Sequence, residues 1–318
     1  MQDLEQYEEK FEQVRKNIKK VIIGYEDVIE DFIICLMTEG HLLLEGVPGI
    51  AKTTLIKTFT KAIGLDYERI QFTQDLLPAD ISGHYYYNQK TGKFDLRKGP
   101  VFAQILMADE INRAPPKTQS ALIEAMQEKQ VTIEGNTFSL PDPFLVIATR
   151  NPIETEGVYP LPEAQLDRFM IKSDMTYLPK DKELDMLTMK NRSYADNIEA
   201  VDNGFGYDIV GLHSQVHVSE PVIKYIRDIV IETRSVDEIV LGASPRAGEQ
   251  LLNASKAKAL IHGRDYVVPD DIKSIAHKVL NHRLILSIDA ELEGIEVLEV
   301  MDEILEEKVE APKGKFND

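Results

Sequence analysis

GVPGIAKTT, residues 46–54, lies between a short apolar strand that we expect at 42–44 and a helix that we expect from about 53 to 63. The two glycines of this segment let the backbone turn its N–H groups toward a phosphate. Lys52 supplies a cation for the β- and γ-phosphates. Thr53 supplies a hydroxyl for Mg²⁺ at the start of the helix, where the helix dipole also favours an anion. The segment therefore predicts a phosphate-binding loop between a strand and a helix.

One position departs from the phosphate-loop pattern G-x-x-x-x-G-K-[ST], because Ala51 stands where the pattern has its second glycine. If this residue needs a positive φ, alanine costs about 1 kcal/mol, which a folded domain tolerates. The structural alternative is an ordinary glycine-rich turn from strand to helix. We expect the segment to hold ATP through Gly46, Val47, Pro48, Gly49, Ile50, Ala51, Lys52, Thr53 and Thr54.

Two adjacent acids follow the apolar run QILMA at 104–108. Open parallel sheets bind ligands at the carboxyl ends of their strands, so Asp109 and Glu110 are expected at the edge that carries the phosphate loop. Asp109 can hold the hydration shell of Mg²⁺ opposite Thr53. Glu110 can orient and polarise an attacking water. Taken without the loop, the same acids would be a helix cap and a solvated charge.

Apolar runs of strand length recur at 68–72, 104–108 and 144–148, with helical sequence at 117–128 between them. This alternation predicts the α/β class, with a parallel sheet covered by helices on both faces, as in P-loop NTPases. Asn151 follows the run at 144–148 and can hydrogen-bond the γ-phosphate or the water that Glu110 activates. A turn-forming Asn before a proline is the alternative.

Two stretches interrupt this rhythm, at 83–99 and 131–140, each with alternating residues around a turn. They predict β-hairpins inserted into the α/β domain. The first carries Tyr85, Tyr86 and Tyr87 in succession. Successive side chains of a strand point to opposite faces, so at most two of these tyrosines can share a face.

Strand signals fade after about residue 179, which predicts an ATPase core at 1–179 and a small all-helical domain at 180–318. The segment 289–310 carries ten acidic residues and one lysine, and we interpret it as a solvated acidic helix or a frayed tail. The other helices are expected at 4–20, 26–38, 181–194, 209–217, 220–234, 245–260 and 269–281.

The charge of the chain restricts its partners. There are 54 Asp and Glu against 36 Lys and Arg, a net charge of −18, which disfavours nucleic acid and anionic membranes as partners. The one cysteine, Cys35, lies in the apolar run FIICLM and is expected to be a buried, inert thiol. The sequence shows no secretory signal and no apolar run long enough to span a bilayer, so we expect a cytoplasmic protein.

Read in order, several segments resemble the MoxR family, in the helix-2-insert branch of the AAA+ ATPases. They cover roughly residues 24–286 and include the Walker A and Walker B segments of the phosphate loop and the acid pair. Alanine at position 51 is also what MoxR loops have. The segments are GVPGIAKT, QFTQDLLPADISG, ADEINRAPPKTQSALIEAMQEKQVTIEG, ATRNPIETEGVYPLPEAQLDRF and GASPRA.

The resemblance implies a ring, usually a hexamer, with ATP and Mg²⁺ held between neighbouring subunits. Arg168 in LDRF resembles an arginine finger that reaches the neighbouring γ-phosphate, and Arg246 in GASPRA resembles the sensor-2 arginine of the lid. Surface ion pairs are the alternative for both. Ile23 and Gly24 resemble the adenine-side loop, although Tyr25 follows where many relatives carry Gln. Arg113 and Arg150 are weaker candidates for contacts between subunits.

The resemblance further implies a chaperone-like remodeller that acts with a separate protein carrying a von Willebrand factor A domain, often in the maturation of metal-containing enzymes. The hairpins would then correspond to the helix-2 insert and the pre-sensor-1 hairpin, and the tyrosines either grip a client or simply pack.

Two other classes of function stay open. One is a nucleotide-gated scaffold with little hydrolysis, and the other is a DNA-associated motor, which the charge of −18 disfavours.

Overall fold

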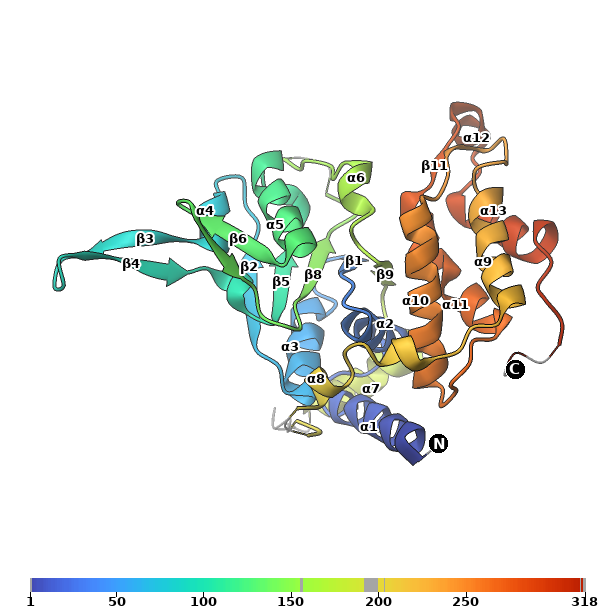
Figure 1. Cartoon of the computed structure of the whole chain (residues 1–318), viewed down its shortest axis with the longest axis horizontal. Helices are drawn as coiled ribbons and strands as arrows, with labels where there is room; N and C mark the ends of the chain where they lie inside the picture. Colours follow the sequence, from blue (N-terminus) through green and yellow to red (C-terminus); the bar gives the residue numbers. More distant parts are fainter. Residues whose placement is uncertain (1, 155–156, 192–199, 203, 315, 317–318) are drawn as a thin grey trace. The chain divides into compact units, whose positions relative to one another are not determined.

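The computed structural model describes residues 2–154, 157–191, 200–202, 204–314 and 316. The chain forms two compact units (Figure 1). The α/β unit comprises Glu12–Phe169 and Ser173–Ile209, and the helical unit comprises Met1–Phe11, Met170–Lys172 and Val210–Asp318.

A five-stranded sheet forms the centre of the α/β unit, with strand order β2-β5-β8-β1-β9. The pairs β2 with β5, β5 with β8 and β8 with β1 are parallel. The central strands are apolar and buried on both faces, which is the pattern of a parallel sheet covered on two sides. The bounds are β1 Leu42–Gly46, β2 Tyr67–Gln71, β5 Ile105–Asp109, β8 Leu145–Arg150 and β9 Ile171–Met175.

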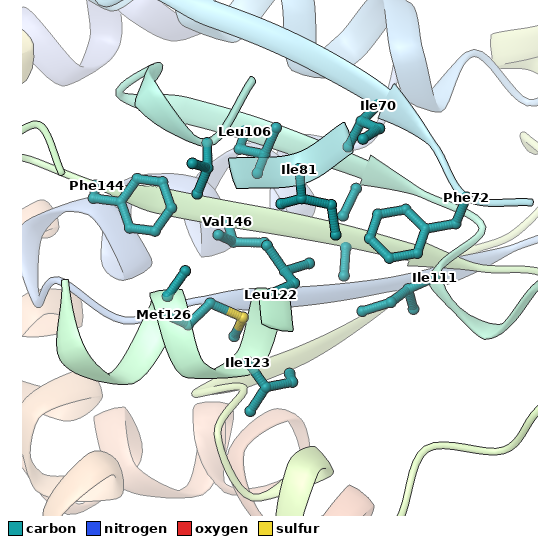
Figure 2. Close-up of a cluster of buried hydrophobic side chains, with 14 of the residues drawn as sticks. Ile70, Phe72, Ile81, Leu106, Ile111, Leu122, Ile123, Met126, Phe144 and Val146 are labelled. Carbon is teal, nitrogen blue, oxygen red and sulfur yellow. The ribbon is translucent and has the colours of Figure 1, made fainter. Parts of the chain in front are cut away.

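One layer of the core lies between the sheet and helix α5, Pro116–Glu128 (Figure 2). Figure 2 shows Leu122, Ile123 and Met126 of this helix beside strand residues Leu106 and Val146. The helix presents apolar residues along one face and the strands present every second residue, so the two apolar faces pack against each other.

The alternate strand residues face the other layer and are equally buried. Helix α2 contacts β1 and helix α3 contacts β5, and the rings of Phe32 and Phe59 pack 5.2 Å apart between these two helices. The α/β prediction with helices on both faces is therefore confirmed. No helix in the described ranges is both long and apolar enough to cross a bilayer. The other helices of this unit are α2 Glu26–Met37, α3 Lys52–Ile63, α4 Pro78–Ser82, α6 Glu163–Leu166, α7 Lys180–Asn191 and α8 Phe205–Asp208, and α1 Gln2–Lys19 begins in the helical unit.

Both predicted hairpins are present. Strands β3 (Gly83–Asn88) and β4 (Lys93–Lys98) pair antiparallel, and so do β6 (Gln130–Ile133) and β7 (Asn136–Ser139). In Figure 1 the β3–β4 hairpin extends well away from the sheet. Its register pairs Tyr85 with Leu96 and Tyr87 with Phe94, so two of the three tyrosines share a face, as predicted.

The helical unit is a bundle with a small sheet added. Strands β10 and β11 pair antiparallel, which the expectation of an all-helical domain did not include. The bundle buries apolar faces of α9, α10 and α11. The bounds are α9 Glu220–Glu232, β10 Ile239–Leu241, α10 Pro245–Ile261, α11 Pro269–Leu280, β11 Ile285–Leu286, α12 Ile288–Glu293 and α13 Val297–Glu303.

Two helix predictions in the C-terminal half are wrong. The segment 209–217 is not one helix, because Gly211 adopts φ 76° and only a short 3-10 turn, Leu212–Gln215, follows it. The acidic segment 289–310 is neither a single solvated helix nor a frayed tail. It forms α12, α13 and a π-helical turn, and it buries Val300, Met301, Ile304 and Leu305. Residues 192–194 of the helix predicted at 181–194 lie outside the described residues.

Candidate active site

The phosphate-loop segment joins the end of β1 to the start of α3. Ala51 has φ 68° and ψ 25°, so alanine does occupy the left-handed conformation that the glycine pattern anticipates. Gly46 is fixed by close approach, because a Cβ there would lie 2.7 Å from the carbonyl oxygen of Met175. Gly49 has φ 85° and open space around it. The loop therefore has the backbone of a phosphate cradle, with Ala51 strained at its entry into the helix.

Lys52 turns back onto its own loop. Its Nζ donates a hydrogen bond to the carbonyl oxygen of Gly46. Burial lowers the pKa of the Lys52 ammonium, and the charges of Asp109, Glu110 and Glu154 oppose that shift. These three carboxylates therefore lie near enough to act on the lysine. The cation is held at the sheet edge where the sequence predicts the phosphates.

Asp109 ends β5, is 8% exposed, and both of its carboxylate oxygens have partners. The hydroxyl of Thr149 donates to Oδ1 at 2.5 Å. The guanidinium of Arg69 donates to Oδ2 from Nε at 3.1 Å and from Nη2 at 2.6 Å. Neighbouring strands supply these partners, β8 the hydroxyl and β2 the guanidinium, so the sheet register fixes the carboxylate.

Glu110 follows the strand with φ 56°, a left-handed conformation rare for this residue type. Its backbone N–H donates to the Thr149 hydroxyl at 2.9 Å. This hydrogen bond stabilises the left-handed backbone of Glu110. Its carboxylate Oε2 accepts from Gln71 Nε2 at 2.6 Å and lies 3.1 Å from Arg113 Nε. Glu110 therefore lies beside Asp109 as predicted, with its carboxylate engaged by an amide and a guanidinium.

Asn151 is 5% exposed at the end of β8, and its Oδ1 accepts from the Ile153 N–H at 3.2 Å. Its side chain also lies near the carboxylate of Glu154 and helps to lower the pKa of that group. Asn151 therefore forms the turn that we gave as the alternative, and it also lies at the sheet edge of the candidate site. Arg113 donates to Glu154 from Nε at 3.0 Å and from Nη2 at 2.5 Å, which lowers the pKa of the Glu154 carboxyl and raises that of the guanidinium.

A cavity of about 330 Å³ opens beside the phosphate loop. Ile23 and Tyr25 line it from one side, and the hydroxyl of Tyr25 donates to the carbonyl of Thr176 at 3.1 Å. Gly24 is packed so closely that a Cβ would lie 2.5 Å from Leu178. The wall also includes residues of and before α7 that the sequence analysis did not name: Tyr177, Leu178, Glu183, Met186 and Lys190.

The three other arginine candidates have different surroundings. Arg168 is half-buried after α6, and within the described part of the chain its guanidinium has no hydrogen-bond or ion-pair partner. Arg246 is exposed in the first turn of α10, which belongs to the helical unit. Arg150 forms an ion pair with the buried Glu45, so it is engaged within its own subunit.

Sequence reasoning missed four residues of this network, which are Thr149, Arg69, Gln71 and Glu154. A signal existed for Thr149, because a polar residue ending an apolar strand beside the strand of Asp109 must find a partner there. Arg69 and Gln71 alternate with the buried Ile70 on β2, which is ordinary for an edge strand. Their reach to Asp109 and Glu110 depends on β2 pairing with β5.

The donor set fits a nucleotide with Mg²⁺. One hydroxyl, Thr53, and one carboxylate, Asp109, are oxygen ligands of the kind that Mg²⁺ prefers, with phosphates and water completing its shell. Among the residues that the structure describes, no three His, Cys, Asp or Glu side chains are grouped as a metal site. The cavity beside the loop is of the volume that small-molecule sites have.

Comparison with known proteins gives the family. Residues 41–171 match the family described as "ATPase family associated with various cellular activities (AAA)", and residues 231–307 match an AAA lid domain. Uncharacterized protein YeaC of Bacillus subtilis is 45% identical over 91% of both chains. Chaperone MoxR1 of Mycobacterium tuberculosis is 41% identical over 91% of this chain and 79% of its own length.

A solved structure agrees with these relatives. The crystal structure of a candidate ATPase from Cytophaga hutchinsonii has a TM-score of 0.91 and 44% identity, and the match covers 98% of each chain. Two related proteins and one solved structure thus match nearly the whole chain, and the residues at the sheet edge have the chemistry of a nucleotide site. The chain belongs to the MoxR family of AAA+ ATPases.

Proposed function

We propose that this protein hydrolyses ATP in a Mg²⁺-dependent reaction at the edge of the sheet beside the phosphate loop. The observation that carries the proposal is that Lys52, at the start of α3, lies near Asp109 and Glu110 at the end of β5, next to a 330 Å³ cavity. Asn151 follows the neighbouring strand β8 at the same sheet edge. The backbone of residues 46–51 and Lys52 would hold the phosphates, and the cavity near Ile23 and Gly24 would take the adenosine part.

Each polar residue has a task in this proposal. Thr53 and Asp109 would hold Mg²⁺, which when bound neutralises charge on the phosphate oxygens. Glu110 would orient and polarise the attacking water, after its carboxylate leaves Gln71 and Arg113. Asn151 would hydrogen-bond that water or the γ-phosphate.

We further propose that the protein assembles as a ring, with six subunits as the expectation, and that Arg168 completes the site of the neighbouring subunit. A guanidinium that has no ion-pair partner in the described residues of its own chain is free for this contact. Arg246 would contact the phosphates from a lid domain. The division into an ATPase core at 1–179 and a lid at 180–318 is part of the same proposal, whereas by contacts the α/β unit extends to Ile209 and includes α7 and α8.

The work done with ATP is proposed to be chaperone-like remodelling of a separate client protein in the cytoplasm, with a von Willebrand factor A domain protein as partner and metalloenzyme maturation as the setting. The name of Chaperone MoxR1 supports the coarse assignment. A nucleotide-gated scaffold is the second candidate. It is favoured by one observation, the engagement of the Glu110 carboxylate by Gln71 and Arg113.

The test is steady-state ATP hydrolysis with Mg²⁺ as a function of protein concentration, for the wild type, Glu110→Gln and Arg168→Ala. We expect a specific activity that rises with concentration and falls by at least about 100-fold in both variants, because one removes the base and the other the transition-state cation. The same titration without Mg²⁺ should show no hydrolysis.

Two other outcomes would redirect the proposal. If the wild type binds ATP but hydrolyses it no faster than Glu110→Gln at every concentration, the scaffold is the better description. If Arg168→Ala keeps the wild-type rate, the site is completed without this residue, and the shared-site ring is wrong in that detail.

A further inference from the structure

The sheet edge contains a third carboxylate that the proposed reaction does not use. Glu154 accepts two hydrogen bonds from Arg113, Nε to Oε2 at 3.0 Å and Nη2 to Oε1 at 2.5 Å. Its carboxylate also lies near the Asn151 side chain, and its charge interacts with the Lys52 ammonium. Its own side chain is 32% exposed, so it can leave this position without unfolding the core.

The partners of Glu154 are of the kind that bind a terminal phosphate. A guanidinium takes carboxylate and phosphate oxygens in the same paired geometry, and an amide N–H and an ammonium donate to either anion. Lys52 and Asn151 are the side chains that the proposed function assigns to the γ-phosphate. Two anions cannot share one set of donors in a partly buried site without a large repulsive cost.

We propose that Glu154 occupies the donors of the γ-phosphate when no ATP is bound, and that ATP must displace it while ADP need not. The inference rests on the proposed function and adds to it a residue that sets the preference between ATP and ADP. ADP ends at the β-phosphate, so it leaves Glu154 on Arg113 and Asn151. ATP brings a γ-phosphate to the same donors, and the carboxylate must move away.

The consequence is a reduced apparent affinity for ATP. A ligand that binds only the state with Glu154 displaced has its affinity lowered by the fraction of molecules in that state. Glu154→Gln removes the competing negative charge and keeps the shape of the side chain. We expect the dissociation constant for an ATP analogue to fall about tenfold and that for ADP to change less than about twofold.

The experiment measures binding, so it does not depend on turnover. Fluorescent N-methylanthraniloyl derivatives of AMP-PNP and of ADP are titrated with Mg²⁺ present into the full-length wild type, Glu154→Gln, Glu154→Asp and a charge-matched control. The control is Glu124→Gln, which removes one charge from the exposed side of α5. The expected result is a lower ratio of the AMP-PNP to the ADP dissociation constant in Glu154→Gln and an unchanged ratio in Glu124→Gln.

Glu154→Asp keeps the negative charge on a shorter side chain. Its ratio of the AMP-PNP to the ADP dissociation constant should therefore lie between those of the wild type and Glu154→Gln. This second variant carries the test if Glu154→Gln folds poorly. The inference is overturned if both variants bind the two nucleotides in the wild-type ratio, or if Glu154→Gln weakens AMP-PNP selectively. A wild type that binds neither nucleotide would instead overturn the proposed function itself, and this inference with it.

Discussion

Thr149 joins the two acids of the candidate site. Its hydroxyl is fully buried, donates to Asp109 Oδ1 at 2.5 Å and accepts from the Glu110 N–H at 2.9 Å. A single hydroxyl thereby orients one carboxylate and supports the left-handed backbone of the other acid. It touches neither nucleotide nor water in the proposed reaction, so its role is to position.

We expect Thr149→Val to lower kcat about 10- to 100-fold, because Asp109 is the proposed Mg²⁺ ligand and hydrogen-bond partners of metal ligands contribute on that scale. ATP affinity measured without Mg²⁺ should change little, because the phosphate loop keeps its conformation. Thr149→Ser retains the hydroxyl and should keep most of the activity. Steady-state hydrolysis and nucleotide titration in EDTA check this, and equal kcat values for Val and Ser would show that the hydroxyl does not matter.

At the residue scale, the places of the candidate residues were predictable where a residue type coincides with the end of a strand. Asp109 ends β5 with Glu110 directly after it, Asn151 follows β8 and Lys52 begins α3, while their roles toward a nucleotide stay predictions. Arg69 was not predictable, because an Arg on an edge strand is usually a solvated charge. Only the pairing of β2 with β5 brings its guanidinium to 2.6 Å from Asp109.

At the scale of elements, the acidic C-terminal segment shows how composition can mislead. Ten acids in 22 residues predict a solvated segment. Its apolar residues nevertheless fall at helical spacing, and Val300, Met301, Ile304 and Leu305 are buried in the helical unit. Exposed charge and buried apolar side chains occupy opposite faces of the same short helices, so a charge count does not measure the apolar face.

This segment should therefore contribute to stability. Met301 is 0% exposed, and we expect Met301→Ala to lower the free energy of unfolding of its unit by about 2–4 kcal/mol. Leu292→Ala is the matched control, because Leu292 is 80% exposed and its loss should cost less than about 0.5 kcal/mol. Urea unfolding followed by circular dichroism measures both. Equal midpoints would mean that the segment is not part of the cooperative fold.

Two other elements could not be predicted from local sequence: strand β9 and the 3-10 turn at Leu212–Gln215. The sequence of β9, IKSDM, alternates apolar and polar residues and is short, so periodicity alone cannot separate it from a loop. Its place beside β1 makes it a strand. The turn forms because Gly211 adopts a positive φ, which ends the helical conformation. Glycine takes positive and negative φ with similar ease, so the sequence alone does not predict which one it adopts.

At the scale of the molecule, each unit has one tyrosine whose pKa is raised to about 12, the half-buried Tyr67 in the α/β unit and the buried Tyr225 in the helical unit. Burial is the first cause in both. Among the described residues, the Tyr225 hydroxyl has no hydrogen-bond partner. The folded state therefore keeps both protons to a higher pH than the unfolded state, whose phenols titrate near pH 10.

Stability should fall as pH rises from about 10 to 12, since the folded state binds more protons than the unfolded state over that range. The contribution is fully present below pH 10. Tyr225→Phe should remove up to about 2 kcal/mol of this alkaline loss, and at neutral pH it should be neutral or stabilising, because it deletes an unpaired buried hydroxyl. Tyr177→Phe, at a site 75% exposed, is the control. Urea unfolding at pH 8 and pH 11 gives the comparison, and identical pH dependence for the three proteins would contradict it.

The sequence by itself determined the loop at 46–54, the order of strands β1, β2, β5 and β8 with helices α2, α3 and α5, both hairpins and the acids at the sheet edge. These follow from local rules, because a motif, an apolar period or a turn is set by residues near one another in the chain. The tertiary structure alone decided which side chains hold the acids, that residues before and within α7 line the cavity, and that the acidic segment is folded. Such contacts join residues about 40 positions apart, as Thr149 and Asp109 are, and strand register rather than local sequence sets them.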